Sequence, residues 1–149
     1  MIELADTAFS VRTDPNQLSV DQNVIERLQK IHPSTMSEFD DGNGPVVWIL
    51  VIPTTLDLMH QFINKEISEK ELFEQTPLDI QYDALYLCSA MVLEEFRGKG
   101  LAKKLTLDAI ENIRKEYPIK TLFVWAFSRE GEGLAEKIAV LADLPLKKR

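Results

Sequence analysis

Hydrophobic residues along the chain follow two patterns, continuous runs and steps of three or four. The runs lie at residues 46–52, at 82–93 (apolar on both faces from residue 85) and at 121–127. A strand covered on both faces of its sheet is apolar throughout, so these runs predict three buried strands. An alternation of apolar and polar residues at 8–12 predicts a further short strand.

Helical spacing fills the segments between these runs. Residues 20–31, 101–117 and 132 to about 144 have apolar positions three or four apart, and two shorter stretches lie between residues 54 and 76. Side chains that favour helix starts precede them: Ser19, Thr54, Ser68 and Ser128. We expect the two short helices to pack sparsely, as a lid or a substrate wall. In the last helix we expect Leu134, Ile138 and Leu141 to point inward.

The order of these elements predicts an α/β (α+β) fold, a mixed sheet flanked by helices. Its centre is a strand–helix–strand unit over residues 85–127, in which the intervening helix makes the two strands parallel. Residues 40–45 form a loop rich in Asp and Gly. The length of 149 residues fits a single domain over residues 1–149.

Composition narrows the class of protein. A net charge of −7 argues against a nucleic-acid partner, which requires a broad basic surface. The single cysteine, Cys88, lies in an apolar run and fits a small core residue in a reducing compartment. The chain shows no secretory signal and no apolar run long enough for a membrane, so we expect a cytoplasmic protein. We expect the basic residues 147–149 to form a solvated tail.

Candidate chemistry is concentrated in the turn that follows the second apolar run. Gly98 and Gly100 stand where the strand gives way to the helix, with Arg97, Lys99 and Lys103 around them. Glycine lets a ligand approach the main chain closely, and the first amides of a helix are free donors. The turn therefore predicts an anion site, most plausibly for a phosphate ester. It contains no Walker A loop, and lysine at position 103 excludes the dinucleotide fingerprint.

The turn also matches a family signature. Arg97-x-x-Gly100-x-Ala102 fits the pattern Arg/Gln-x-x-Gly-x-Gly/Ala, and residues 85–142 resemble the cofactor-binding half of the GCN5-related N-acetyltransferases. The resemblance implies acetyl-CoA as the acyl donor. It implies that backbone amides hold the pyrophosphate, that a neighbouring strand pairs with the pantetheine arm, and that a polar contact follows the next strand. The positions concerned are Gly98, Lys99, Gly100, Leu101, Ala102 and Lys103 for the amides, Arg97 for added charge, Ala90, Met91 and Val92 for the pantetheine, and Ser128 for the polar contact.

The catalytic half departs from the family. Where many relatives carry a tyrosine in the last helix this chain has Ala135, and Phe123 or its neighbours stand where some carry a glutamate. Polar groups near the expected acyl position are Tyr82, Tyr86, Cys88, Ser89 and Glu94, and Tyr86, Glu94 and Ser128 are the catalytic candidates. Each of them also fits an ordinary structural role. His32 and His60 fit neither a catalytic role nor a metal site, and no metal is expected.

We expect the sheet to have fewer strands than is usual in the family that the turn resembles. The family usually has a β-hairpin before the motif strand, whereas this sequence predicts one strand followed by two helices, and four or five strands in all. Residues 121–127 would then form an apolar edge, which proteins rarely leave bare. We expect the C-terminal tail, or a second copy of the chain in a homodimer, to cover it.

Three functions follow as hypotheses. The first is an acetyl-CoA-dependent N-acetyltransferase that moves the acetyl group to a primary amine of a small molecule or peptide by direct attack on the thioester. The second is a non-catalytic acyl-CoA-binding or protein-interaction module on the same fold. The third is a nucleotide-phosphate binder that uses the same turn. The identity of the acceptor stays open.

Overall fold

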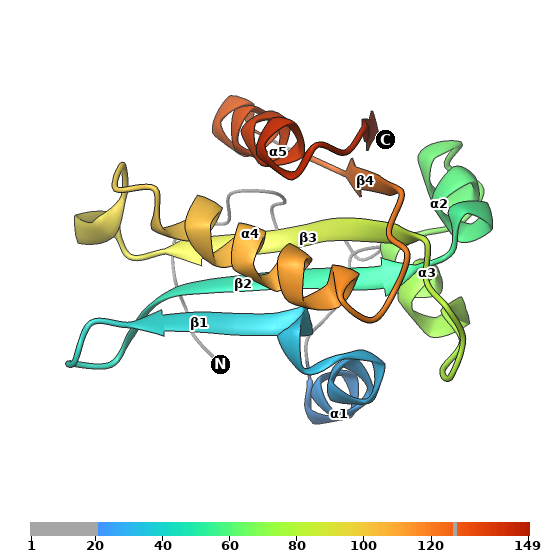
Figure 1. Ribbon diagram of the computed structural model, residues 1–149, viewed down its shortest axis with the longest axis horizontal. Helices are drawn as coiled ribbons and strands as arrows, with labels where there is room; N and C mark the ends of the chain where they lie inside the picture. The colour runs from blue at the N-terminus through green and yellow to red at the C-terminus, as the bar shows by residue number, and fades with distance from the viewer. Residues whose placement is uncertain (1–20, 127) are drawn as a thin grey trace.

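The computed structural model describes residues 21–126 and 128–149, so the strand predicted at 8–12 lies outside the described residues. Within them a five-stranded mixed sheet has the order β1–β2–β3–β4–β5 (Figure 1). Neighbouring pairs are antiparallel from β1 to β3 and parallel from β3 to β5. The strands are β1 (Met36–Asp40), β2 (Pro45–Thr54), β3 (Ala84–Val92), β4 (Thr121–Val124) and β5 (Leu146–Lys148). The predicted class, a mixed sheet flanked by helices, is confirmed.

The three apolar runs form the central strands β2, β3 and β4. Most of their side chains are buried, and Val51, Leu85 and Leu122 have no exposed surface. The last run is shorter as a strand than predicted, since β4 ends at Val124.

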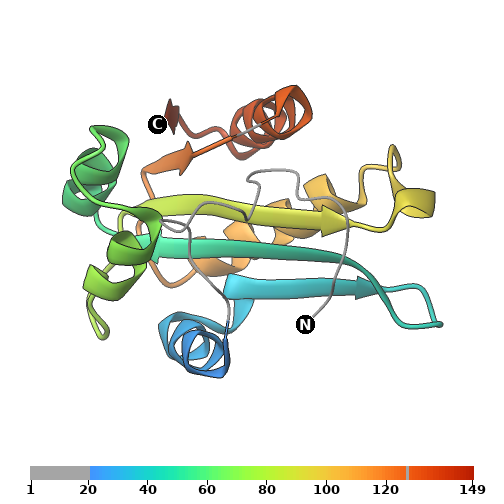
Figure 2. The same ribbon diagram turned by 180° about the vertical axis from the view of Figure 1, so that it is seen from behind.

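Five helices accompany the sheet in the described residues: α1 (Gln22–Ile31), α2 (Leu56–Ile63), α3 (Glu69–Gln75), α4 (Leu101–Arg114) and α5 (Arg129–Ala142). Helix α4 lies across one face of the sheet and connects the parallel strands β3 and β4, as predicted, while α2 and α3 lie at the end where β2 passes to β3 (Figures 1 and 2). Ser68 with Glu71, and Ser128, cap helices as predicted. Asp21 and Thr55 cap α1 and α2 in place of the predicted Ser19 and Thr54.

The prediction that no hairpin precedes the motif strand is wrong. Strand β1 pairs antiparallel with β2, with Met36 opposite Leu50 and Phe39 opposite Val47. The loop between them is the predicted one, and the Asp40 carboxylate accepts hydrogen bonds from the amides of Gly42 and Gly44. Strand β1 is an edge strand whose side chains are partly or fully exposed, so it has no apolar run to announce it.

The expectation that α2 and α3 pack sparsely is also wrong. Met59 and Phe62 of α2 and Leu72 and Phe73 of α3 are at most 4% exposed and belong to the core. Both helices are therefore fixed parts of the domain. In α5 the predicted inward residue Leu141 is 58% exposed, and the buried side of that helix is formed by Ala135, Ile138 and Ala139.

The edge of β4 is covered by the chain itself. Strand β5 pairs with β4, with Leu146 opposite Leu122 and Lys148 opposite Val124. The prediction that the tail covers this edge is confirmed, whereas the prediction that residues 147–149 form a solvated tail is wrong. With β5 in place, the bare edge that motivated a homodimer no longer exists.

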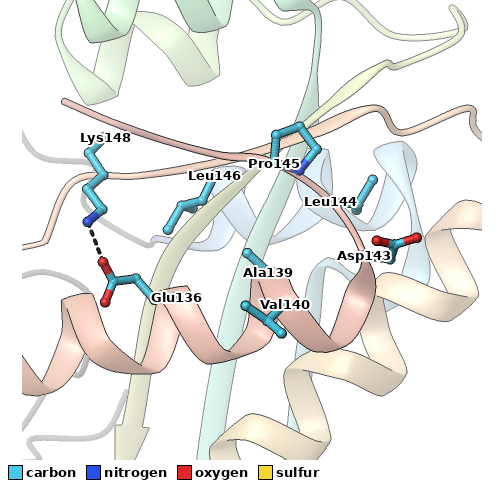
Figure 3. Close-up of a pocket in the computed structure, with 8 residues that line it drawn as sticks. All are labelled: Glu136, Ala139, Val140, Asp143, Leu144, Pro145, Leu146 and Lys148. Atoms are coloured by element: carbon cyan, nitrogen blue, oxygen red, sulfur yellow. Dashed lines mark hydrogen bonds and ion pairs between the residues drawn. The ribbon is translucent and has the colours of Figure 1, made fainter.

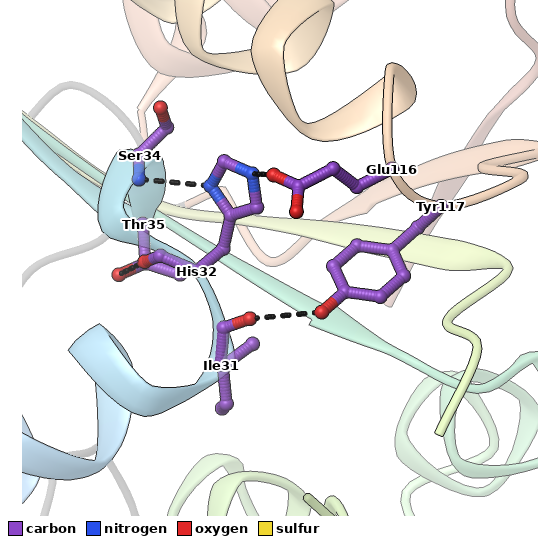
Figure 4. A network of polar contacts seen from close by, with 6 residues as sticks. All are labelled: Ile31, His32, Ser34, Thr35, Glu116 and Tyr117. Atoms are coloured by element: carbon purple, nitrogen blue, oxygen red, sulfur yellow. Dashed lines mark hydrogen bonds and ion pairs between the residues drawn. The ribbon is translucent and has the colours of Figure 1, made fainter. Parts of the chain in front are cut away.

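His32 is a structural residue. Its ring is 4% exposed, its Nδ1 accepts the Ser34 amide at 2.9 Å, and its Nε2 contacts the Glu116 carboxylate (Figure 4). The neighbouring Tyr117 hydroxyl donates to the Ile31 carbonyl at 3.2 Å. These contacts tie the end of α1 to the segment after α4.

Candidate functional site

The strands that pair with β3 change halfway along its length. Its register with β2 shifts so that Leu50 lies opposite Ser89 whereas Val51 lies opposite Leu87, which makes Cys88 the extra residue of a bulge. Pairing with β4 runs from Ala84 to Leu87 and stops there. A bulge bends a strand and increases its twist, and in Figure 1 β3 extends well past the end of β4 toward the turn before α4. No described strand continues beside residues 90–92 on this side.

The main chain of this part of β3 can accept another strand. The Leu93 amide donates to the Val46 carbonyl, so Val92 and Val47 form a pair whose amides and carbonyls point away from each other. Two residues earlier, Ala90 repeats this orientation opposite Ile49. The Ala90 and Val92 peptide groups therefore point to the side that β4 has left, while Met91 turns toward β2. Of the three residues predicted to pair with a pantetheine arm, two have this geometry.

The glycine turn leads directly from this edge into α4. Gly98 and Gly100 have φ of 78° and 73°, the left-handed conformation that glycine adopts at no steric cost. No described side chain caps α4 at Gly100, and the first turn closes with Lys104 N–H bonded to the Gly100 carbonyl at 3.0 Å. The amides of residues 101–103 precede that bond, so the start of α4 presents donors and the positive end of its dipole.

The basic side chains predicted for the turn surround this helix start. Arg97 and Lys99 are exposed, and the Lys99 ammonium lies 5.3 Å from the centre of the Phe96 ring. Lys103 is half-buried on the first turn of α4, with Leu101 beside it, while Ala102 is buried against the sheet. An elongated ligand with an anionic end could use both features, with its charge at α4 and its chain along the open edge of β3.

A buried hydrogen-bonded pair of a tyrosine and a glutamate lies at the other end of the same strand segment. The Tyr86 hydroxyl donates to the Glu69 carboxylate at 2.6 Å, and the Cys88 thiol lies 3.7 Å from the same oxygen. None of the three side chains has exposed surface. Tyr86 and Cys88 were among the predicted polar groups, and the structure brings them together.

Glu69 was missed by the sequence reasoning. As the first residue of α3 after the Ser68 cap, it reads as an ordinary acidic residue in a first helical turn. The signal that could have identified it is its spacing, since Glu69, Leu72 and Phe73 stand at i, i+3 and i+4 on one helical face. That face is buried, and it places the Glu69 carboxylate within hydrogen-bond distance of the Tyr86 hydroxyl.

The other candidates have different surroundings. Glu94 is exposed in the turn, Ser89 is buried on β3, and the Ser128 hydroxyl caps α5 by accepting the Gly131 amide at 3.0 Å. The Tyr82 hydroxyl donates to the Pro77 carbonyl, and burial, with the nearby Tyr117, raises the pKa of Tyr82 above its usual value. None of these four contacts Glu69 in the way that Tyr86 does.

The places that the resemblance assigned to proton-transfer groups, Ala135 and Phe123 or its neighbours, are apolar and enclosed. Ala135 and Phe123 have no exposed surface, and the Phe123 ring stacks on Tyr86 with centres 4.9 Å apart. Tyr86, whose ring stacks on Phe123, is the residue through which this part of β4 lies close to the Glu69 carboxylate.

An open depression of about 720 Å³ lies between α5 and β5 (Figure 3), and no residue of the glycine turn lines it. Its wall includes Ala139, Val140 and Leu146, with an ion pair between Lys148 and Glu136 at one side. It contains none of the predicted site residues.

In the described residues no group of three or more His, Cys, Asp or Glu side chains could hold a metal ion. No helix there is both long enough and apolar enough to cross a membrane. No family model matches the chain, and no curated protein or solved structure is significantly similar to it.

Proposed function

We propose that this protein is a coenzyme A-dependent N-acyltransferase with acetyl-CoA as its acyl donor. The observation that supports this most strongly is the edge of β3 beside which no described strand lies. It runs from the bulge at Cys88 to a glycine turn and a helix start that no described side chain caps. A thioester of coenzyme A has the matching shape, with an anionic pyrophosphate at one end and an amide-bearing arm at the other.

The cofactor would lie along β3 in a defined direction. Its pyrophosphate accepts hydrogen bonds from the first amides of α4, with Arg97, Lys99 and Lys103 supplying positive charge. Its pantetheine amides pair with the peptide groups of Ala90 and Val92 as an added strand would. From Val92 back to Cys88 the strand covers about 13 Å, four residues at ~3.3 Å each. The thioester then reaches the bulge, beside Tyr86.

The reaction is direct attack of a neutral amine on the thioester carbonyl. The C–N bond forms, the C–S bond breaks, and the electron pair of that bond leaves on the sulfur as a thiolate. We assign Glu69 as the acceptor of the amine proton and Tyr86 as the donor to the thiolate, with Tyr86 regaining its proton from Glu69. Because both side chains are buried, this assignment requires the acyl group to enter just past Leu87, where the pairing of β3 with β4 ends.

Calorimetric titration with acetyl-CoA, CoA and ATP tests the cofactor. We expect both CoA species to bind and the Lys103→Ala variant to bind them several-fold more weakly. Lys104→Ala is the matched control, since it removes the same charge from an exposed position one residue further along α4. Absence of binding by both CoA species would refute the proposal, and binding of ATP alone would favour a nucleotide-phosphate site.

A non-catalytic acyl-CoA-binding module is the second candidate. The specific observation in its favour is that Ala135 and Phe123 are enclosed and apolar where relatives in the resembling family hold proton-transfer groups. Release of free thiol from acetyl-CoA with a panel of polyamines, amino acids and peptides separates the two. An enzyme releases thiol with at least one amine and loses that activity in Glu69→Gln, whereas a binding module takes up acetyl-CoA without thiol release.

A further inference from the structure

The Arg149 guanidinium lies against two aromatic rings. Its central carbon is 4.5 Å from the centre of the Phe62 ring and 4.5 Å from that of Trp125. Phe62 comes from α2, and Trp125 follows the last residue of β4. Two backbone contacts hold the residue in place: its amide donates to the Val124 carbonyl at 3.0 Å and its Nη1 donates to the Ile67 carbonyl at 3.1 Å.

These rings connect Arg149 to the proposed reaction centre. The Phe62 ring meets Tyr86 edge-on with centres 5.0 Å apart, and it meets Trp125 edge-on at 5.9 Å. Tyr86 in turn donates its hydroxyl hydrogen bond to Glu69. A continuous series of aromatic contacts therefore connects the Arg149 guanidinium with the buried Glu69 carboxylate.

Ring faces attract cations, and guanidinium and ammonium groups bind them most strongly where water is excluded. Phe62 has no exposed surface, and Arg149 and Trp125 are half-buried, so these contacts are partly dry. The net charge of −7 also favours a positively charged ligand over a negative one.

We propose that Phe62 and Trp125 form a binding site for the cationic group of the acceptor, and that the Arg149 guanidinium occupies this site until an acceptor displaces it. The inference rests on the proposed acyltransferase function and adds a substrate class. The acceptor is an amine that carries a second positive group, a guanidinium or an ammonium, at the end of an aliphatic chain. The second group binds the rings while the amine faces Tyr86 and Glu69.

If the acceptor must displace Arg149, the two compete for the same pair of aromatic rings. A cationic acceptor must replace the contacts that Arg149 makes with both rings, so the native chain binds it more weakly than a chain without this side chain. The Arg149 amide bond to Val124 is a main-chain contact, so β5 stays paired when the side chain is changed.

The test uses Trp125 fluorescence in a Trp48→Phe background, where Trp125 is the only tryptophan. The probe is agmatine, which carries a guanidinium and a primary amine, and n-butylamine is the control ligand without the guanidinium. We expect Arg149→Ala to bind agmatine at least threefold more tightly than the parent, with no such gain for n-butylamine. Lys147→Ala removes an exposed cation from β5, two residues before Arg149, and should bind as the parent does.

Arg149→Gln provides a second variant that keeps a side-chain donor for the Ile67 carbonyl, and circular dichroism and thermal melting verify the fold of each variant. Equal agmatine affinity in the parent and in both Arg149 variants would overturn the proposal, as would an equal gain in Lys147→Ala. The titration contains no coenzyme A. Failure of coenzyme binding would therefore remove the acyltransferase function while leaving the cation site measurable, and failure here would leave coenzyme binding intact.

Discussion

The hydrogen bond between Tyr86 and Glu69 supports a prediction that tests the proposed reaction centre without any substrate. Tyr86→Phe deletes one oxygen and leaves the ring, so its stack on Phe123 and its edge contact with Phe62 are kept. Neither Tyr86 nor Glu69 has exposed surface, so water does not replace the lost bond. A hydrogen bond to a charged group contributes about 1.5–3 kcal/mol to stability.

That loss translates into a melting temperature. In a domain of this size a change of ~1 kcal/mol moves the melting temperature by about 2–4 °C, so we expect Tyr86→Phe to melt roughly 3–12 °C lower. Tyr82→Phe is the matched control, because the Tyr82 hydroxyl donates to the uncharged Pro77 carbonyl. It should lose only about 1 kcal/mol.

A double-mutant cycle with Glu69→Gln isolates the pair. If the two side chains interact as the structure has them, Tyr86→Phe destabilises the Glu69→Gln protein much less than it destabilises the native chain. Urea unfolding followed by tryptophan fluorescence gives the four free energies of unfolding. Additivity within about 0.5 kcal/mol would mean that the two side chains do not interact, and the assignment of Glu69 and Tyr86 to proton transfer would fall with it.

Three further predictions concern single residues. Burial raises the pKa of Tyr82, so above pH ~10 the unfolded chain loses the phenol proton before the folded chain does. The free energy of unfolding therefore falls as pH rises from ~10 toward the folded pKa. In melting curves measured across this pH range, Tyr82→Phe should show a smaller fall in stability than the native chain. Gly100→Ala places a side chain at φ 73° with no contact closer than 3.9 Å, so backbone strain alone should cost about 1–2 kcal/mol in urea unfolding. Thr55→Ala removes the side chain that accepts the Leu58 amide and should lower the melting temperature by about 2–4 °C in calorimetry; no change would place the cap elsewhere.

The central unit of the fold could be predicted because its burial is nearly complete. Strands enclosed on both faces need apolar residues at every position, and helix α4 needs them at every third or fourth, so both leave unambiguous patterns. Strand β1 leaves no such hydrophobic pattern in the sequence. Its residues Ser37 and Glu38 face partly or fully outward, and the strand is specified by pairing with β2 rather than by its own hydrophobicity.

The functional candidates likewise differ in whether the sequence alone could predict them. The glycine turn is local in sequence, and its chemistry can be read from neighbouring residues. The contacts of Glu69 with Tyr86 and of Arg149 with Phe62 join residues 17 and 87 positions apart, a separation that no local pattern records. A charged residue in a first helical turn and a basic residue just after a short edge strand look like surface features, whereas the tertiary structure buries Glu69 and half-buries Arg149.

The bulge at Cys88 relates the edge of β3 proposed for the cofactor to the Tyr86–Glu69 pair proposed for proton transfer. Before the bulge β3 is held between β2 and β4, and Tyr86 is fixed in the core by Phe123 and Phe62. After the bulge the same strand has lost β4, and its Val92 and Ala90 peptide groups point to the open side. A ligand that pairs with this edge, anchored at the start of α4, must end where the strand is again occupied, which is beside Tyr86. The position of its reactive end is thus set by a single irregularity in one strand. Helix α3 brings Glu69, its first residue, to the same point, where the carboxylate accepts the Tyr86 hydroxyl hydrogen bond.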